Sequence, residues 1–299
     1  MERGSIVVFG ATGHVGGVIA DRLLAAGRKV RAVSRSSGRL EALARRGAEA
    51  LTGDMADAAF LKRALSGAEA AFVLLPPPSA PTGIRAAQDR LSVALADALR
   101  AAGVSYAVSL SSIGADQRSG GGPIDGLHVL EERLNGVRGL NLLHLRAGYF
   151  FENHLASIAM IRTMGILGSA LRADLRMAQI ASRDIGEVAA RRLEALDLAG
   201  REILELQGQR DLTPAECAGI LGKAIGKPDL TYAAFPYPDA EKGMVKAGVP
   251  AEMAALYVEM SKGFNEGTLK PLAPRSAKTT TRTSLETWAA EVFAPAFRG

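Results

Sequence analysis

The sequence predicts an α/β fold in which a doubly wound parallel sheet is followed by a smaller helix-rich C-terminal lobe. Strand and helix patterns alternate along the first half of the chain, which is typical of a parallel sheet with helices on both faces. Beyond Gly148 this alternation stops. With 299 residues, 48% of them hydrophobic, the chain can bury one large core or two smaller ones.

Each element of the first half follows from its local hydrophobic period. Short apolar runs predict strands at residues 5–9, 29–34, 48–51, 70–75, 105–110 and 141–145. Apolar residues at helical spacing predict helices at residues 14–26, 38–46, 57–65, 84–102 and 127–134. Short connections that contain glycine join these elements, as expected for a parallel α/β sheet.

The second half has a different pattern. The stretches "AEMAALYVEMSKGFNEG" and "SLETWAAEVFAPAF" predict helices, whereas "ILELQG" and "LTYAAF" predict isolated strands. We expect residues 1–150 to form the sheet domain, with residues 177–207 returning to it. Residues 151–176 and 208–299 would form the smaller lobe. The stretch "RSGGGPIDG" at residues 118–126 has the composition of a flexible insert.

Composition argues against several classes of function. The net charge is +5, but 36 basic and 31 acidic residues are scattered without interleaved aromatic residues, which disfavours a nucleic-acid surface. No apolar run reaches the roughly 18 residues of a membrane span. The single cysteine, Cys217, allows no internal disulfide, and the histidines lack metal-ligand spacing. We expect a soluble cytoplasmic protein that binds no metal, nucleic acid or membrane.

The stretch "VVFGATGHVGG" has a glycine at every third position after the first strand. Gly10 permits the turn, Gly13 lets a pyrophosphate approach the backbone, and Gly16 lets the helix pack on the sheet. The helix N-terminus also offers N–H groups and a partial positive charge to phosphates. The pattern predicts a Rossmann-type dinucleotide site, and the alternative is a turn whose glycines are purely steric. The candidate residues are Gly10, Thr12, Gly13, His14, Val15 and Gly16.

The end of the second strand indicates which dinucleotide is bound. A cofactor with a free ribose 2′-hydroxyl usually meets a carboxylate there, but this chain has Ser34 and Arg35 and no carboxylate before Glu41. A guanidinium pairs well with a 2′-phosphate. We therefore expect NADP(H) rather than NAD(H). Arg31 or Arg39 could share this role, and the alternative is that Arg35 is a solvated loop cation.

The stretch "LTGDMAD" follows the third predicted strand, where an adenine ring would rest. Asp54 and the backbone of Met55 are candidates to contact the edge of that ring. The alternative is that Asp54 caps the following helix.

Several stretches together resemble the NmrA-like group of atypical short-chain dehydrogenases/reductases. They are "GATGHVGG", "VRAVSR", "LTGDMAD", "FVLLPPP", "SLSSIGA", "LHVLEERL" and "LRAGYFFEN". The C-terminal stretches "ASRDIGEVAA" and "LTPAECAGILGKAIGKPDLTY" resemble the branch that holds quinone oxidoreductase type 2 and triphenylmethane reductase. The resemblance implies reduction of quinones, azo dyes or related acceptors, although the group also contains redox-sensing regulators without turnover.

The resemblance also assigns roles to individual residues. It implies a loop along the cofactor formed by Leu75, Pro76 and Pro77. It implies that the nicotinamide lies near Ser111 and Ser112. It implies that the mouth between the two lobes is lined by Tyr149, Phe150 and Asn153.

One motif departs from the group. Its members usually carry an Arg-Pro-Gly loop, whereas this chain has Arg146-Ala147-Gly148, so we expect a looser loop.

The Tyr/Lys pair of ordinary short-chain dehydrogenases is missing. Ile124 and His128 fill the two corresponding positions in "GPIDGLHVLEERL". An acceptor that delocalises the incoming electrons needs no such pair, because the cofactor carries the chemistry and the protein orients it. The candidate catalytic residues are His128, which would touch the cofactor or protonate the acceptor, and Tyr149. The alternative for both is a packing role.

These observations predict an NADPH-dependent reductase that transfers hydride to a small conjugated or aromatic acceptor, acting as a monomer or homodimer. A non-catalytic NADP(H) sensor is the alternative from another class. An epimerase of the extended type is a weaker reading because the Tyr/Lys pair is absent.

Overall fold

The computed structural model describes residues 4–77 and 80–299. The chain folds into two compact units. The first, here called the sheet unit, comprises Met1–Ser111, Gly126–Arg146 and Ile185–Leu204. The second unit comprises Ser112–Asp125, Ala147–Asp184 and Glu205–Gly299.

A seven-stranded sheet with the order β10-β6-β5-β4-β1-β2-β3 forms the centre of the sheet unit. Its strands are β1 (Ser5–Phe9), β2 (Val30–Ser34), β3 (Glu49–Thr52), β4 (Ala68–Val73), β5 (Tyr106–Ser112), β6 (Asn141–Ala147) and β10 (Arg201–Leu206). Strands β1 to β5 pair in parallel, and the backbone hydrogen bonds of β6 to β5 and β10 run in the same sense. The predicted doubly wound α/β fold is confirmed.

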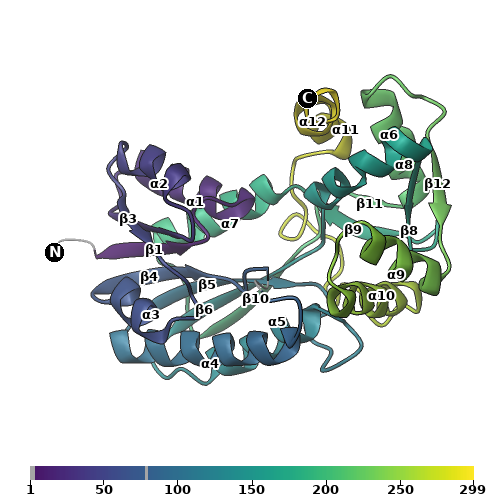
Figure 1. Cartoon of the computed structure of the whole chain (residues 1–299). Helices are drawn as coiled ribbons and strands as arrows, with labels where there is room; N and C mark the ends of the chain where they lie inside the picture. Colours follow the sequence, from purple (N-terminus) through teal and green to yellow (C-terminus); the bar gives the residue numbers. More distant parts are fainter. Residues whose placement is uncertain (1–3, 78–79) are drawn as a thin grey trace. The chain divides into compact units, whose positions relative to one another are not determined.

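Helices cover both faces of this sheet (Figure 1). They are α1 (His14–Ala25), α2 (Ser37–Ala44), α3 (Ala58–Leu65), α4 (Ile84–Ala102), α5 (Ile124–Asn135) and α7 (Ser182–Ala195). The apolar side chains of α3, α4 and α5 form one core with the adjoining face of the sheet, including Leu61, Leu95 and Leu130.

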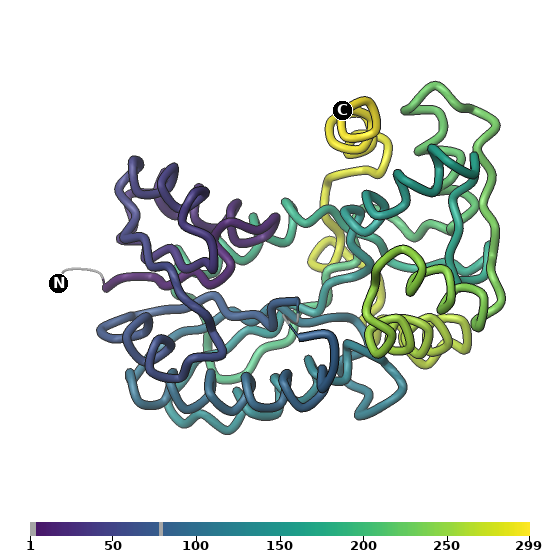
Figure 2. Tube along the Cα trace, in the orientation of Figure 1, coloured from purple at the N-terminus to yellow at the C-terminus, as the bar shows by residue number. Residues whose placement is uncertain are grey.

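On the other face, α7 returns to pack beside α1 (Figure 2). A Cβ atom on Gly186 would lie under 3.0 Å from the Val18 side chain, so only glycine allows this approach.

The second unit combines two small sheets with short helices. Its strands pair in the orders β11-β9-β7 and β12-β8. These strands are β7 (Tyr149–Phe150), β8 (Ile166–Ser169), β9 (Met177–Ile180), β11 (Asp211–Leu212) and β12 (Thr231–Ala234). Its helices are η1 (Phe151–Ser157), α6 (Ile158–Met164), α8 (Pro214–Ala224), α9 (Tyr237–Lys246), α10 (Ala251–Asn265), α11 (Leu285–Trp288), η2 (Ala289–Phe293) and α12 (Ala294–Arg298). Its core gathers around Trp288, Phe151 and Phe293.

Both stretches predicted to be isolated strands do form strands, but neither strand is isolated. The stretch "ILELQG" does not form an isolated strand, because β10 is the edge strand of the large sheet. The stretch "LTYAAF" contains β12, which pairs with β8. A strand as short as β8 gives too little periodicity to be recognised without its partner.

The unit boundaries differ from those expected in several short segments. Residues 112–125, 147–150, 177–184 and 205–207 belong to the second unit. The sheet unit therefore ends close to the carboxyl ends of β5 and β6, and the chain that follows each of these ends belongs to the second unit.

The stretch at residues 118–126 is not the flexible insert that its composition suggested. The Gly121 N–H donates to Asp125 Oδ1 at 2.8 Å. Gly122 has a φ of +59° and lies against α10, where an added Cβ would be under 3.0 Å from the Leu256 carbonyl oxygen. Gly121 and Gly122 therefore serve close packing here.

Replacing Gly122 with alanine should lower the free energy of unfolding by about 3 kcal/mol, because it adds left-handed backbone strain to a backbone clash. Urea denaturation measures the loss. Gly120 provides the control, since its φ is +86° but nothing lies within 4 Å of an added Cβ. Gly120→Ala should cost only about 1 kcal/mol, and equal losses in the two variants would contradict the packing argument.

Candidate cofactor and substrate residues

The carboxyl ends of the parallel strands lie at one edge of the sheet, and most candidate residues lie there. Gly10 directly follows β1, Ser34 ends β2, and Ser111 is the penultimate residue of β5. Strand β1 is flanked by β2 and β4, and the chain reverses its direction of winding between β1 and β4. Open α/β sheets bind ligands at such a switch point.

The β1–α1 turn is closed by the glycines that the sequence singled out. Gly10 has a φ of +66°, and its carbonyl accepts the Gly13 N–H at 2.9 Å. A Cβ on Gly16 would lie under 3.0 Å from the Gly10 carbonyl oxygen. Only glycine at this position lets α1 begin directly against the turn.

The N-terminus of α1 has the features of a phosphate-binding site. Gly13 is its N-cap, and among the described residues no side chain caps it and no acid stands in its first turn. Gly13 and His14 are exposed. The first N–H groups of a helix have no partner within the helix, so these groups and the helix dipole fit a pyrophosphate.

The end of β2 carries a polar frame beside this turn. Thr12 Oγ1 and Ser34 Oγ lie 2.7 Å apart. Arg39 donates from Nη1 to the Thr12 carbonyl at 3.2 Å, which places its guanidinium beside this turn, and Arg35 is exposed. The two arginines therefore lie on the segment that follows β2, with no carboxylate between them.

Arg31 does not share this role. Its Nε pairs with Glu49 at 2.8 Å, and its Nη1 donates to the carbonyls of Ala64 and Ser66 at 2.7 and 2.9 Å. The side chain thus binds the C-terminal end of α3, so the suggestion that it could assist Arg35 is wrong.

The alternative interpretation of Asp54 as a helix cap is also wrong. Asp57 is the N-cap of α3, and its Oδ1 accepts the Ala59 N–H at 2.8 Å. Asp54 instead accepts the Ala56 N–H at 2.9 Å within the preceding turn and is exposed. Met55 is buried in the core below it.

The ends of β4 and β5 place the next group of candidates. Leu75 and Pro76 are half-buried and Pro77 is exposed. Ser111 is buried, and its Oγ donates to Glu131 Oε1 at 2.5 Å. Since a hydroxyl has one proton, Ser111 cannot donate to a cofactor at the same time. Ser112 is half-buried and donates to the carbonyl of Ile113 at 2.9 Å.

His128 lies in α5 with its side chain 15% exposed, and its Nε2 is 3.4 Å from Glu132 Oε1. The contact joins residues one turn apart on the same helix face.

Tyr149, Phe150 and Asn153 lie near the start of the Ala147–Asp184 segment of the second unit. Tyr149 and Phe150 form β7 and are half-buried, and Asn153 is exposed. Burial raises the pKa of Tyr149 well above its usual value, although a hydrogen bond with Asn153 opposes this. The phenol is thus protonated at neutral pH and is a weaker acid than the tyrosine of a Tyr/Lys pair.

A row of buried polar groups begins next to Tyr149, and no motif in the sequence indicates it. The Tyr149 and His154 rings are 5.8 Å apart between centroids. The His154 Nε2–H donates to Gln179 Oε1 at 3.2 Å, and Gln179 Nε2 donates to Cys217 Sγ at 3.2 Å. Burial raises the pKa of Cys217 to about 12, so its thiol remains neutral.

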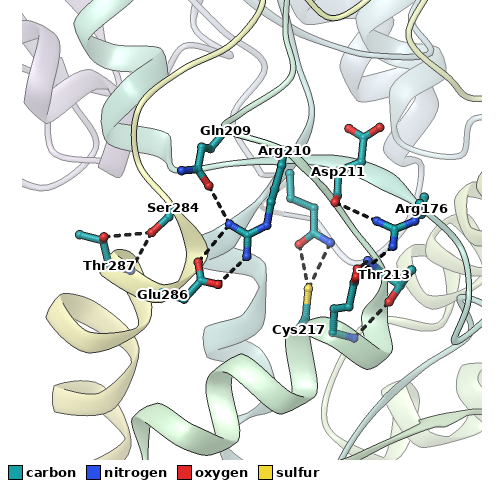
Figure 3. A network of polar contacts seen from close by, with 11 residues as sticks. Arg176, Gln209, Arg210, Asp211, Thr213, Cys217, Ser284, Glu286 and Thr287 are labelled. Carbon is teal, nitrogen blue, oxygen red and sulfur yellow. Dashed lines mark hydrogen bonds and ion pairs between the residues drawn. The ribbon is translucent and has the colours of Figure 1, made fainter.

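Figure 3 shows the surroundings of this thiol, where two ion pairs join distant segments of the second unit. Arg210 pairs with Glu286 of α11. Arg176 pairs with Glu216, which also completes a capping box with Thr213 at the start of α8.

The Arg146-Ala147-Gly148 segment is not loose, in contrast to the expectation. The Ala147 carbonyl accepts the Ile113 N–H at 3.0 Å, and the Gly148 N–H donates to the Leu206 carbonyl at 2.9 Å. A Cβ on Gly148 would lie 2.6 Å from the Ala178 carbonyl oxygen. Strand pairing therefore holds this segment without a proline.

Within residues 4–77 and 80–299, no three His, Cys, Asp or Glu side chains cluster as a metal site would require. No helix in the described part of the chain is long and apolar enough to cross a membrane.

The fold and the glycine turn define a Rossmann-like nucleotide-binding protein. The model of the NmrA-like family matches residues 2–289, and the chain belongs to that family.

Two named relatives of this chain are an oxidoreductase and an azoreductase. It is 28% identical to quinone oxidoreductase 2 of Escherichia coli (strain K12), over 88% of this chain and 89% of that protein. It is 29% identical to the NAD(P)H azoreductase of Xenophilus azovorans, over 83% of each. The crystal structure of the E. coli NADPH-dependent quinone oxidoreductase with NADPH has a TM-score of 0.78 and 27% identity, covering 96% of this chain and 99% of that chain.

The buried His154 should make stability depend on pH. Burial lowers its pKa from 6.5 to about 4 in the folded protein. The unfolded state therefore binds more protons as the pH falls from about 6.5 to 4, and the free energy of unfolding should drop by roughly 3 kcal/mol across that range. Above pH 6.5 His154 is neutral in both the folded and the unfolded state, so the stability that is lost at lower pH is fully present.

Urea titrations at several pH values test this. His154→Gln should reduce the dependence between pH 4 and 6.5 by about half, because burial also lowers the pKa of His144 to about 4. The slope above pH 7 should stay as in the wild type. An unchanged slope below pH 6.5 would contradict the assignment.

Proposed function

We propose that this NAD(P)H-dependent oxidoreductase uses NADPH to reduce a conjugated acceptor such as a quinone or an azo compound. The observation that carries the proposal is the uncapped N-terminus of α1 behind the closed glycine turn, with Arg35 and Arg39 in place of a carboxylate after β2. The names of the two curated relatives support a reductase of such acceptors.

The chain's own residues bind the cofactor in distinct ways. The N–H groups at the start of α1 hold the pyrophosphate. Arg35 pairs with the 2′-phosphate, and Arg39 adds a second positive charge while its contact to Thr12 restrains it. Asp54 and the Met55 backbone contact the adenine, and the segment from Leu75 to Pro77 lies along the cofactor.

The reaction places few chemical demands on the protein. NADPH, when bound, would supply a hydride, and a quinone needs one proton besides that hydride to become a hydroquinone. Tyr149, Phe150 and Asn153 contact the acceptor and orient it. His128 donates the proton, because the chain lacks the Tyr/Lys pair that supplies it in ordinary short-chain dehydrogenases. Tyr149 is the less suitable donor because burial raises its pKa.

Purified protein with NADPH and a panel of quinones and azo dyes should oxidise the cofactor, with turnover on the order of 10 per second for a good acceptor. Loss of NADPH absorbance measures it. Gly16→Ala, which blocks the turn beneath the phosphates, is the control and should show no oxidation. Tight NADPH binding by the wild type without oxidation by any acceptor would instead support a sensor.

Arg35→Glu should weaken NADPH binding about 30-fold and NADH binding at most about twofold, because only NADPH carries the 2′-phosphate. Isothermal titration calorimetry measures both. Arg45→Glu is the matched control, since Arg45 is exposed at the other end of α2, and it should leave the ratio of the two affinities unchanged. Equal losses for both cofactors in Arg35→Glu would overturn the 2′-phosphate assignment.

A further inference from the structure

Glu131 of α5 makes three short contacts with side chains of two sheet strands. Its carboxylate accepts two hydrogen bonds from Arg146 of β6, at 3.0 Å from Nε and 2.6 Å from Nη2. It also accepts the Ser111 hydroxyl of β5 at 2.5 Å. All three residues are at most 6% exposed.

A second polar contact, partly buried, lies one helical turn further along α5. The His144 Nε2–H of β6 donates to Asn135 Oδ1 at 3.1 Å, and His144 Nδ1 lies 2.6 Å from Ser109 Oγ of β5. This contact is two residues earlier on each strand and four residues later on the helix. The two contacts therefore follow one helix face along one strand pair, with α5 antiparallel to the strands.

These contacts act on the placement of α5 more than on its stability. Leu130 and Leu134 already pack the helix onto the core, but apolar packing has little directional preference. A buried ion pair gains little over apolar residues of similar volume, because desolvation offsets the attraction. Its bidentate geometry is directional, however, and fixes both the translation and the rotation of the helix.

His128 lies three residues before Glu131 on α5, so the two occupy neighbouring positions along the helix. A slip of α5 by one residue would move His128 by about 1.5 Å and rotate it by about 100°. An error of that size disrupts a proton transfer, which needs a hydrogen-bond distance.

We propose that Glu131 is a positioning residue: together with Arg146 and Ser111 it holds α5 in register with the carboxyl ends of β5 and β6, and so sets the position of His128. The proposal rests on the proposed function, in which His128 donates the proton. Ser111, which the resemblance placed near the nicotinamide, then acts through Glu131 rather than by donating to the cofactor.

The test removes the ion pair without leaving an isolated charge. The double variant Glu131→Leu/Arg146→Met should melt near the wild-type temperature, since neither charge is left unpaired. Its kcat should fall about tenfold or more, whereas the KM for NADPH changes less than about twofold, because the misplaced group acts in the chemical step. The ring nitrogen signals of His128 in NMR spectra should shift.

The double variant Arg28→Met/Glu69→Leu is the matched control, since it too removes both charges of a pair. It breaks the pair between Glu69 of β4 and the buried Arg28, whose atoms lie 3.3 Å apart, away from α5. It should change neither kcat nor the His128 signals. If the double variant does not fold, Glu131→Gln, which keeps the shape of the side chain, is measured in the same way.

Unchanged His128 signals in the folded variant would overturn the proposal, as would an unchanged kcat. If none of the acceptors leads the wild type to oxidise NADPH, the proposed function fails. The NMR comparison then still decides whether Glu131 positions His128.

Discussion

The approach of Gly16 to the Gly10 carbonyl is the constraint on which the cofactor residues depend. Any side chain at position 16 would place a carbon under 3.0 Å from that oxygen and push α1 away from the turn. Because the helix begins immediately after the turn, its first N–H groups are presented where the strands end. Thr12, in the same turn, contacts Ser34 of β2 and Arg39 of α2.

A reductase that lacks the Tyr/Lys pair depends on placement more than on acid–base strength. An acceptor that delocalises electrons lowers the need for a protein acid, and orientation then supplies much of the rate enhancement. The contacts of Glu131 with Arg146 and Ser111 agree with this emphasis, since directional contacts between α5 and the sheet restrict where His128 can be.

The second unit contributes shape and neutral polar groups around Tyr149. His154 and Cys217 have pKa values of about 4 and about 12, so both are uncharged near pH 7. Gln179 satisfies both of them through its amide. A neutral environment of this kind suits an acceptor whose charge changes little on binding, and it costs the fold little because the polar atoms are paired.

The sequence by itself determined the strand and helix alternation, the glycine turn and the nature of the residues after β2, because these depend on neighbours within about ten positions along the chain. Tertiary structure alone decided which polar residues are used. Glu131 and Glu132 are adjacent and equivalent in sequence, yet one is buried against Arg146 and the other is exposed beside His128. Arg31 and Arg39 likewise differ only in their distant partners. The physical reason is that a side chain's charge state and role depend on groups that the fold brings together from far along the chain.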